Sequence, residues 1–219
     1  MPKYILPWIS MFSTYIPLLA AFILARRQHL TKDIKILLLF LGIAGTMEAI
    51  ALGYGMMGRP NLWMLHVYTP IEFSLTLLIL SYWHRDHRVR RSIRAGIPVY
   101  LALYALTKIY QLEDFSPGAL NYLTRPVSQL IAGGVAVYTL QQIWYFSEGQ
   151  LHKNYRFWIT AAFLLYNAVG VIIFALTVVK DHQSLFFLAY LHALVNIAHN
   201  LLFTAGILCA VRFKSELAE

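Results

Sequence analysis

Apolar segments of about 20 residues recur along the whole chain, and short stretches that hold most of the charged residues separate them. An α-helix needs about this length of apolar sequence to cross a lipid bilayer. The pattern predicts seven membrane-spanning helices, at residues 4–25, 35–57, 61–83, 95–112, 119–145, 157–179 and 184–211. The expected fold is therefore an all-α polytopic membrane protein, with residues 1–219 forming a single seven-helix transmembrane domain.

Composition and charge support a bilayer location and suggest an orientation. Only 13% of the 219 residues are charged, whereas soluble domains have roughly 25%. Thirteen Lys and Arg residues lie in alternate connections and the C-terminal tail, and four lie on the opposite side. Because positively charged loops stay cytoplasmic, we expect the N-terminus outside and the C-terminus inside, in the inner (cytoplasmic) membrane of a bacterium.

The net charge of +8 follows from this topology and from contact with anionic lipid, so it does not indicate nucleic-acid binding. The most basic connection is HRDHRVRRSIR, from His84 to Arg94. This stretch is foremost a topology signal. It is also the surface on which a cytoplasmic or membrane signalling partner, or lipid headgroups, would be expected to bind.

Ionisable and amide side chains interrupt several of the predicted spans. Such residues are costly in lipid, usually face the protein interior and often mark functional sites. Most lie in the outer half or near the middle of their spans, which predicts a polar cavity that opens outward. The candidate ligand-binding residues are Glu48, His66, Tyr68, Glu72, Arg125, Asn167, His192, Asn196, His199 and Asn200.

The stretch HALVNIAHN, residues 192–200, carries the densest polar pattern. Successive residues of an α-helix turn by about 100°. His192, Asn196, His199 and Asn200 therefore fall on one stripe, which we expect to face the bundle while the rest of the helix faces lipid. The alternative is that this polar network only holds helices together.

Charge balance predicts an ion pair inside the bundle. Glu48 and Glu72 supply two negative charges, and Arg125 supplies one positive charge. Because an unpaired buried carboxylate is costly, Arg125 is expected to pair with one of the two. The other is expected to be neutral or close to a histidine. Pro70 and Pro126 are expected to break their helices beside this cluster and free carbonyl groups.

No cofactor is required by the sequence, but two kinds remain open. His66, His192 and Glu72 are the candidate ligands of a metal ion. His192 and His199 are seven residues apart, about 10.5 Å along a helix, which is too far for one ion. A haem would need His66 opposite His192 or His199. No catalytic residue is assigned, and an enzyme is not the favoured class.

Two predicted spans suggest an internal repeat. LHVYTPIEFSLTLLIL (65–80) and LHALVNIAHNLLFTAGIL (191–208) both begin with Leu-His at the same depth. A plan of three helices, a linker helix and three helices would follow, with a site near the midplane. Seven-span sugar exporters of the SWEET type, and opsins, are similar to this plan in topology.

The segments NLWMLHVYTPIEF (61–73), RFWITAAFLLYNAVG (156–170) and LHALVNIAHNLLFTAGILC (191–209) resemble a group of uncharacterised bacterial seven-transmembrane-helix inner-membrane proteins. The resemblance covers most of the chain. It implies the seven-helix fold and no established activity. It implies recurring positions at His66, Tyr68, Glu72, Arg125, Trp158, His192, Asn196 and Asn200.

The leading hypothesis is a sensor or receptor-like protein that binds a small ligand or protons in an outward-facing cavity and signals through its cytoplasmic loops. A small-molecule transporter of SWEET-like topology is the first alternative. A membrane-embedded enzyme that uses a metal or haem, and a structural subunit of a larger complex, are the others.

Overall fold

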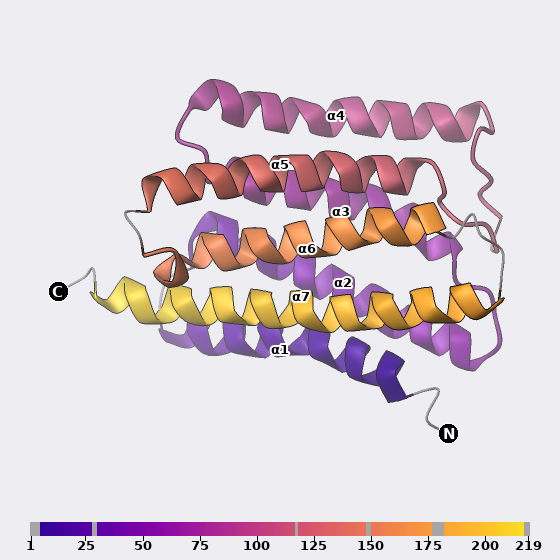
Figure 1. Ribbon diagram of the computed structural model, residues 1–219, viewed down its shortest axis with the longest axis horizontal. Helices are drawn as coiled ribbons and strands as arrows, with labels where there is room; N and C mark the ends of the chain where they lie inside the picture. Colours follow the sequence, from indigo (N-terminus) through magenta and orange to yellow (C-terminus); the bar gives the residue numbers. More distant parts are fainter. Residues whose placement is uncertain (1–4, 28–29, 117, 148–149, 177–181, 217–219) are drawn as a thin grey trace.

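The computed structural model describes residues 5–27, 30–116, 118–147, 150–176 and 182–216 (Figure 1). The described residues form seven α-helices and no strand, which confirms the all-α prediction. A short 3₁₀ turn, η2 (Leu151–Lys153), precedes α6. The helices are α1 (Ile5–Arg27), α2 (Lys32–Met56), α3 (Trp63–Ser81), α4 (His87–Ile109), α5 (Thr124–Phe146), α6 (Tyr155–Leu176) and α7 (His182–Glu216).

Five of these helices are long and apolar enough to cross a membrane: α1, α2, α3, α6 and α7. The other two differ in composition. α4 begins in the basic segment, and α5 contains Arg125 and three glutamines. Apolar side chains such as Phe12 and Leu19 of α1 are 57% and 64% exposed. Exposed apolar surface of this extent is typical of a protein that contacts lipid or a partner.

Two helices, α4 and α5, begin more than three residues away from their predicted starts. α4 starts at His87 rather than at residue 95, because the Asp86 carboxylate accepts a hydrogen bond from the Arg88 backbone N–H (2.7 Å) and caps the helix. α5 starts at Thr124 rather than at residue 119. Residue 4 and residues 177–179 of the expected spans lie outside the described residues, as do Lys3 and Lys180.

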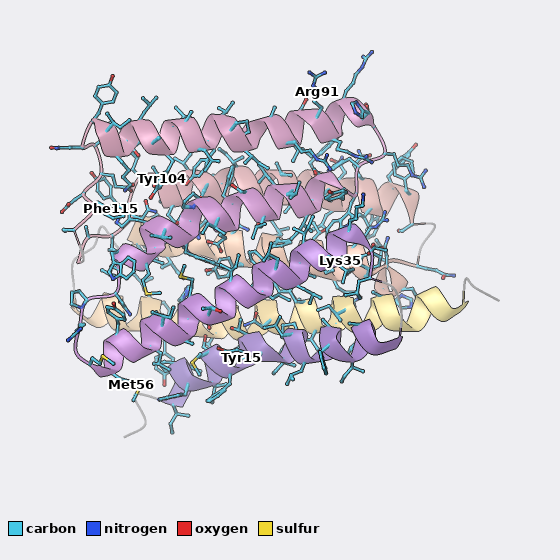
Figure 2. All side chains as sticks on the ribbon, turned by 180° about the vertical axis from the view of Figure 1, so that it is seen from behind. Tyr15, Lys35, Met56, Arg91, Tyr104 and Phe115 are labelled. Carbon is cyan, nitrogen blue, oxygen red and sulfur yellow. The ribbon has the colours of Figure 1, made fainter. Side chains whose placement is uncertain are left out.

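The helices form two layers, with α4 along one edge. Figure 1 shows α5, α6 and α7 in front of α3, α2 and α1, and Figure 2 shows the same layers from behind. Across the layers α1 contacts α7 and α3 contacts α5, while α4 packs mainly against α3. The order is thus three helices, a peripheral helix and three helices.

Connections alternate between the two ends of the bundle. One end, which we call the basic end, carries the α1–α2, α3–α4 and α5–α6 connections and the C-terminal end of α7. Lys35 and Arg91 lie at this end, whereas Met56 and Phe115 lie at the opposite end, where the chain begins (Figure 2). Gly58, with a φ of 65°, reverses the chain after α2, a conformation that glycine adopts without strain.

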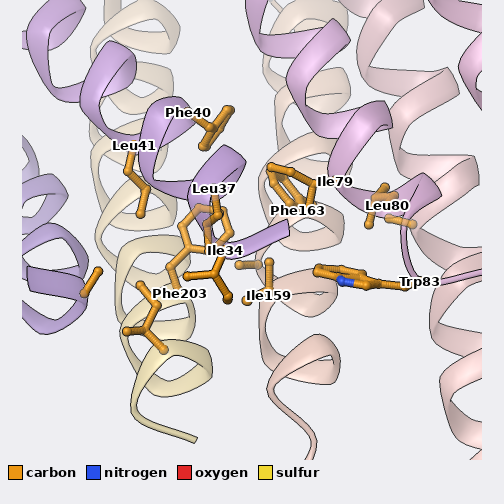
Figure 3. Packing of buried hydrophobic residues seen from close by; sticks show 14 of the residues in the cluster. Ile34, Leu37, Phe40, Leu41, Ile79, Leu80, Trp83, Ile159, Phe163 and Phe203 are labelled. Carbon is orange, nitrogen blue, oxygen red and sulfur yellow. The ribbon is translucent and has the colours of Figure 1, made fainter. Parts of the chain in front are cut away.

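The half of the bundle toward the basic end is filled with apolar side chains (Figure 3). Phe40, Phe163 and Phe203, from three helices, pack edge to face with ring centroids 5.4, 6.0 and 5.0 Å apart. Edge-to-face packing is the favoured arrangement of aromatic pairs. Each of the three rings is at most 2% exposed, so they close this half of the bundle.

A buried polar contact joins the ends of three helices beside this core. The Asp33 carboxylate at the start of α2 accepts hydrogen bonds from Trp83 Nε1 (2.8 Å) and from the Tyr155 hydroxyl (2.7 Å). The three residues come from the start of α2, the end of α3 and the start of α6. Their contact fixes these ends relative to one another.

Gly206 sets the close approach of α6 and α7, and its replacement by alanine is expected to destabilise the fold. A Cβ at this position would lie 2.7 Å from Ile159 Cγ1 and 3.1 Å from the Tyr155 carbonyl oxygen. We expect Gly206→Ala to cost about 1–3 kcal/mol of unfolding free energy, as overpacking does. Reversible unfolding in mixed detergent–SDS micelles measures this.

The matched control is Gly42→Ala in α2, because a Cβ at Gly42 meets nothing within 4 Å. This variant should be at least as stable as the wild type, since alanine favours a helix over glycine. Equal stabilities of the two variants would contradict the close packing of α6 on α7.

Candidate functional site

A cavity of about 740 Å³ lies between the two layers of helices. Leucine, alanine, methionine, isoleucine, phenylalanine and glycine supply about half of its lining. Polar side chains supply the rest: Thr14, Glu48, Asn61, Tyr68, Glu72, Arg125, Gln129, Tyr166, His192, Asn196, His199 and Asn200. Eight of the ten sequence candidates therefore line one cavity. His66 and Asn167 do not.

The cavity lies away from the basic end. Asn61 and Leu62 of the α2–α3 turn and Leu120 of the α4–α5 connection line it at the end away from the basic end, which we call the cavity rim. Leu41 and His199 line the cavity on the side toward the basic end. The centroids of the His199 and Phe203 rings lie 4.4 Å apart. The aromatic core therefore begins where the cavity ends.

Arg125 forms the ion pair that the charge balance predicts. The side chain is 3% exposed, and Nη1 lies 3.3 Å from Glu72 Oε2. Nη1 also donates to Thr69 Oγ1 (3.0 Å), and Nη2 donates to the Tyr166 hydroxyl (3.1 Å). Arg125 of α5 is thereby bound to both α3 and α6, and its charge is neutralised by Glu72.

The Glu48 carboxylate instead accepts hydrogen bonds from uncharged groups. Oε1 accepts from Asn196 Nδ2 (2.6 Å), and Oε2 accepts from Thr14 Oγ1 (2.9 Å). Among the described residues, no Lys, Arg or His nitrogen lies within 4 Å of this carboxylate. The second acidic group of the cavity wall thus has hydrogen-bond donors but no counter-charge within 4 Å among the described residues.

The polar stripe of α7 has two roles. Asn196 Nδ2 donates to Ser10 Oγ (2.9 Å), and Asn200 Nδ2 donates to Ser13 Oγ (2.9 Å) and Thr14 Oγ1 (3.1 Å). The two asparagines therefore fasten α7 to α1. They line the cavity with their neighbours, but their amide nitrogens are already used in helix packing.

Sequence reasoning missed the partners on α1. Ser10, Ser13 and Thr14 are 7%, 4% and 2% exposed. Their spacing of i, i+3 and i+4 places them on one helix face. This spacing was the available signal, since three small hydroxyl residues on one face of an apolar helix indicate a helix contact.

The two histidines of the stripe have aromatic neighbours. The centroid of the Tyr166 ring lies 4.8 Å from the centroid of the His199 ring and 6.0 Å from that of the His192 ring. His199 is 5% exposed, and neither of its ring nitrogens has a hydrogen-bond partner in the described part of the chain. His192 is exposed and lines the cavity.

His66 belongs to a second polar network, at the α4–α5 connection. Its Nδ1 lies 2.8 Å from Lys108 Nζ, and its Nε2 lies 3.2 Å from the Ala119 carbonyl oxygen. Lys108 also forms an ion pair with Glu113 (2.8 Å). We call His66, Lys108 and Glu113, with Asn121 and Thr124, the loop network.

Glu113 is the centre of the loop network, and its side chain is fully buried. The carboxylate accepts from the backbone N–H groups of Leu123 (2.8 Å) and Thr124 (3.2 Å), and so caps the start of α5. Burial raises the pKa of Glu113, but hydrogen bonds from Lys108, Leu123 and Thr124 outweigh it and hold the pKa below its usual value. No sequence pattern pointed to this residue, because a lone glutamate in a polar connection is ordinary.

Asn167 and the prolines also differ from expectation. The Asn167 side chain donates to the Phe163 carbonyl within α6 (2.7 Å) and packs beside Gly133 of α5. α3 continues through Pro70 without a break, and the Tyr104 hydroxyl donates to the His66 carbonyl, four residues before the proline (2.5 Å). Pro126 lies in the first turn of α5, where its missing N–H breaks no helix bond.

Neither proposed cofactor arrangement that uses His66 is present. Both ring nitrogens of His66 are occupied within the loop network, while His192 and His199 line the cavity. Within the described ranges, no group of three His, Cys, Asp or Glu side chains is placed to hold a metal ion.

The stretch from His84 to Arg94 is partly used in internal contacts. Arg90 donates to the His84 carbonyl (3.0 Å), and Arg94 donates to Ser81 Oγ (2.9 Å). His84 itself is buried, and burial together with the nearby Arg90 charge lowers its pKa. Arg85, His87, Arg88 and Arg91 remain exposed at the basic end.

Comparison of the chain with protein-family models, with curated proteins and with solved structures finds no match. The functional interpretation therefore rests on the geometry of the cavity and of the two ends of the bundle.

Removing the charge of Arg125 is expected to destabilise the bundle. Arg125→Met leaves Glu72 buried without a partner, which costs about 3–5 kcal/mol of unfolding free energy. Because Glu72→Gln removes the unpaired charge, the double variant should recover part of that loss. Unfolding in mixed detergent–SDS micelles measures all three proteins, and Arg91→Met at the exposed basic end is the control. A double variant no more stable than Arg125→Met would argue against the ion pair.

Acid is expected to weaken the loop network through Glu113. A carboxylate whose pKa is lower in the folded state stabilises the fold above its unfolded pKa, and this contribution is lost as the pH falls through the folded value. The melting temperature of the wild type should therefore fall below about pH 4.5, the usual glutamate value.

Glu113→Gln is expected to lower the melting temperature at pH 7 and to reduce its dependence on acid. Tryptophan fluorescence in detergent at several pH values measures both effects. Asp86→Asn, at the opposite end of the bundle, is the matched carboxylate control. The same acid dependence in wild type and Glu113→Gln would contradict a stabilising ionised Glu113.

Proposed function

We propose that this chain is a seven-transmembrane receptor-like protein that binds a small ligand in the cavity and signals at the basic end. One observation carries the proposal: the bundle is hollow and polar in one half, and closed by an aromatic core in the other. In this proposal a ligand would enter past the α2–α3 turn and would meet Phe40, Phe163 and Phe203 beyond the cavity.

The proposed orientation follows the charges. The basic end would be cytoplasmic, which places the N-terminus and the cavity rim outside, in the inner membrane of a bacterium. α4 and α5 would span the bilayer with the five more apolar helices. The exposed Arg85, Arg88 and Arg91 would then face anionic headgroups or a cytoplasmic partner.

A transporter of SWEET-like topology is the second candidate, and the arrangement of helices favours it. α1–α2–α3 and α5–α6–α7 form two layers in which α1 lies against α7 and α3 against α5, with α4 at the edge. A two-fold axis between parallel three-helix repeats would give this arrangement. Such a protein would open its cavity alternately to both sides.

Cysteine labelling tests the cavity and separates the two candidates. Cys209 is the only cysteine, so Cys209→Ser provides a background for single cysteines. We expect Ala51→Cys, on the cavity wall, to react with a membrane-impermeant maleimide added to the outer face. Ala136→Cys, in the fully buried core, should not react. Ser92→Cys, exposed at the basic end, should react only in inside-out vesicles.

Each outcome has a distinct meaning. A receptor with an outward cavity predicts labelling of Ala51→Cys from the outside alone. Labelling from both sides would favour the transporter. No labelling from either side, with Ser92→Cys reactive, would exclude an accessible cavity and overturn the proposal.

A further inference from the structure

The cavity has an acidic group for which the described part of the chain supplies no counter-charge within 4 Å. Its ionisable acidic and basic lining residues, apart from the histidines and tyrosines, are Glu48, Glu72 and Arg125. Arg125 and Glu72 neutralise each other. Among the described residues, Glu48 accepts hydrogen bonds from the amide of Asn196 and the hydroxyl of Thr14. An ionised carboxylate in an apolar bundle is costly unless a cation pairs with it.

Hydrogen-bond acceptors beside the cavity also lack donors. Gln129, on α5, is 4% exposed, and its Oε1 has no partner among the described residues. Neither ring nitrogen of His199 has a partner among the described residues, and a neutral imidazole presents one donor and one acceptor nitrogen. Both residues line the cavity. The described residues therefore leave part of the hydrogen-bonding capacity of Gln129 and His199 unused.

Aromatic rings form part of the same wall. Tyr68, Tyr166 and Phe174 line the cavity together with His192. The Arg125 guanidinium already lies near the rings of Tyr68 (6.0 Å to the centroid) and Phe174 (5.7 Å). These rings therefore offer a ligand an apolar and aromatic surface. The remaining lining is aliphatic, and a volume of about 740 Å³ is in the range of pockets that hold small organic ligands.

We infer that the cavity binds a small organic cation, with its ammonium group at Glu48 and its apolar or aromatic body against Tyr68, Tyr166 and Phe174. An ammonium group carries donors and no acceptor, which matches the carboxylate oxygens of Glu48 on the cavity wall. An anionic ligand is disfavoured, because the guanidinium of Arg125 is already paired. This inference rests on the proposed ligand-binding function and specifies the class of ligand.

Three probes of one size test the inference: phenethylamine, 2-phenylethanol and phenylacetate, which carry an ammonium, a hydroxyl and a carboxylate. Binding is measured by calorimetry on the wild-type protein in nanodiscs, with empty nanodiscs as the control for partition into lipid. We expect the amine to bind at least about tenfold more tightly than the alcohol, since charge-assisted hydrogen bonds are the stronger ones. Phenylacetate should bind most weakly.

Glu48→Gln is expected to remove the preference for the amine over the alcohol. Asp86→Asn is the matched control, because that carboxylate is exposed at the basic end and does not lie on the cavity wall. Since Glu48 also bonds Thr14 and Asn196, the fold of the variant is checked by its melting temperature and by Ala51→Cys labelling in the same background.

The results separate this inference from the proposed function. Equal binding of amine and alcohol, or an unchanged preference in Glu48→Gln, would overturn the cation site and indicate that Glu48 carries a proton instead. Binding of none of the probes to a protein whose Ala51→Cys is labelled would also overturn it, while the cavity would stand. Absence of labelling would overturn the proposed function itself.

Discussion

The buried ion pair between Arg125 and Glu72 is the interaction on which the hollow half of this bundle depends. α5 is less apolar than its neighbours and does not qualify as a span by composition alone. Its Arg125 side chain, 3% exposed, contacts Glu72 and Thr69 of α3 and Tyr166 of α6. A guanidinium in this place is tolerable only because these partners surround it. The position of α5 beside α3 and α6 therefore follows from the pair.

The helices are held together by different kinds of contact in the two halves of the bundle. Toward the basic end, small residues such as Ala21, Ala136 and Gly206 allow close packing around the three phenylalanines. In the other half, polar side chains hold the helices through single hydrogen bonds, as between Asn196 and Ser10. Directional contacts of this kind fix the spacing of helices without filling the space between them. A cavity can thus persist in a bundle that is tightly packed elsewhere.

Much of the architecture could be predicted from the sequence. Long apolar runs predict helices because a bilayer leaves few other ways to satisfy backbone groups. Charge balance predicted an ion pair for Arg125, and the 100° rotation placed the polar residues of α7 on one face. Charge balance could not choose between Glu48 and Glu72, because the choice depends on which helix α5 packs against.

The contacts of His66 could not be predicted from the sequence. Its depth and its place beside Tyr68 suggested a cavity residue. The fold of the α4–α5 connection brings Lys108 and Glu113 against it instead. Irregular connections follow no periodic pattern, so their contacts are set by tertiary packing. The seven-helix topology, the orientation and the repeat stay predictions, since the described structure supports five helices as spans by length and composition.

The contacts around the cavity also constrain how binding there could be transmitted. α7 is held to α1 by Asn196 and Asn200 and to α6 at Gly206, so it is a poor candidate for movement. α4 packs mainly against α3, and its end is joined to the start of α5 through Lys108 and Glu113. Arg125 follows directly in α5. A ligand that alters the surroundings of Arg125 would therefore act first on α5 and α4, and α4 begins in the exposed arginines of the basic end.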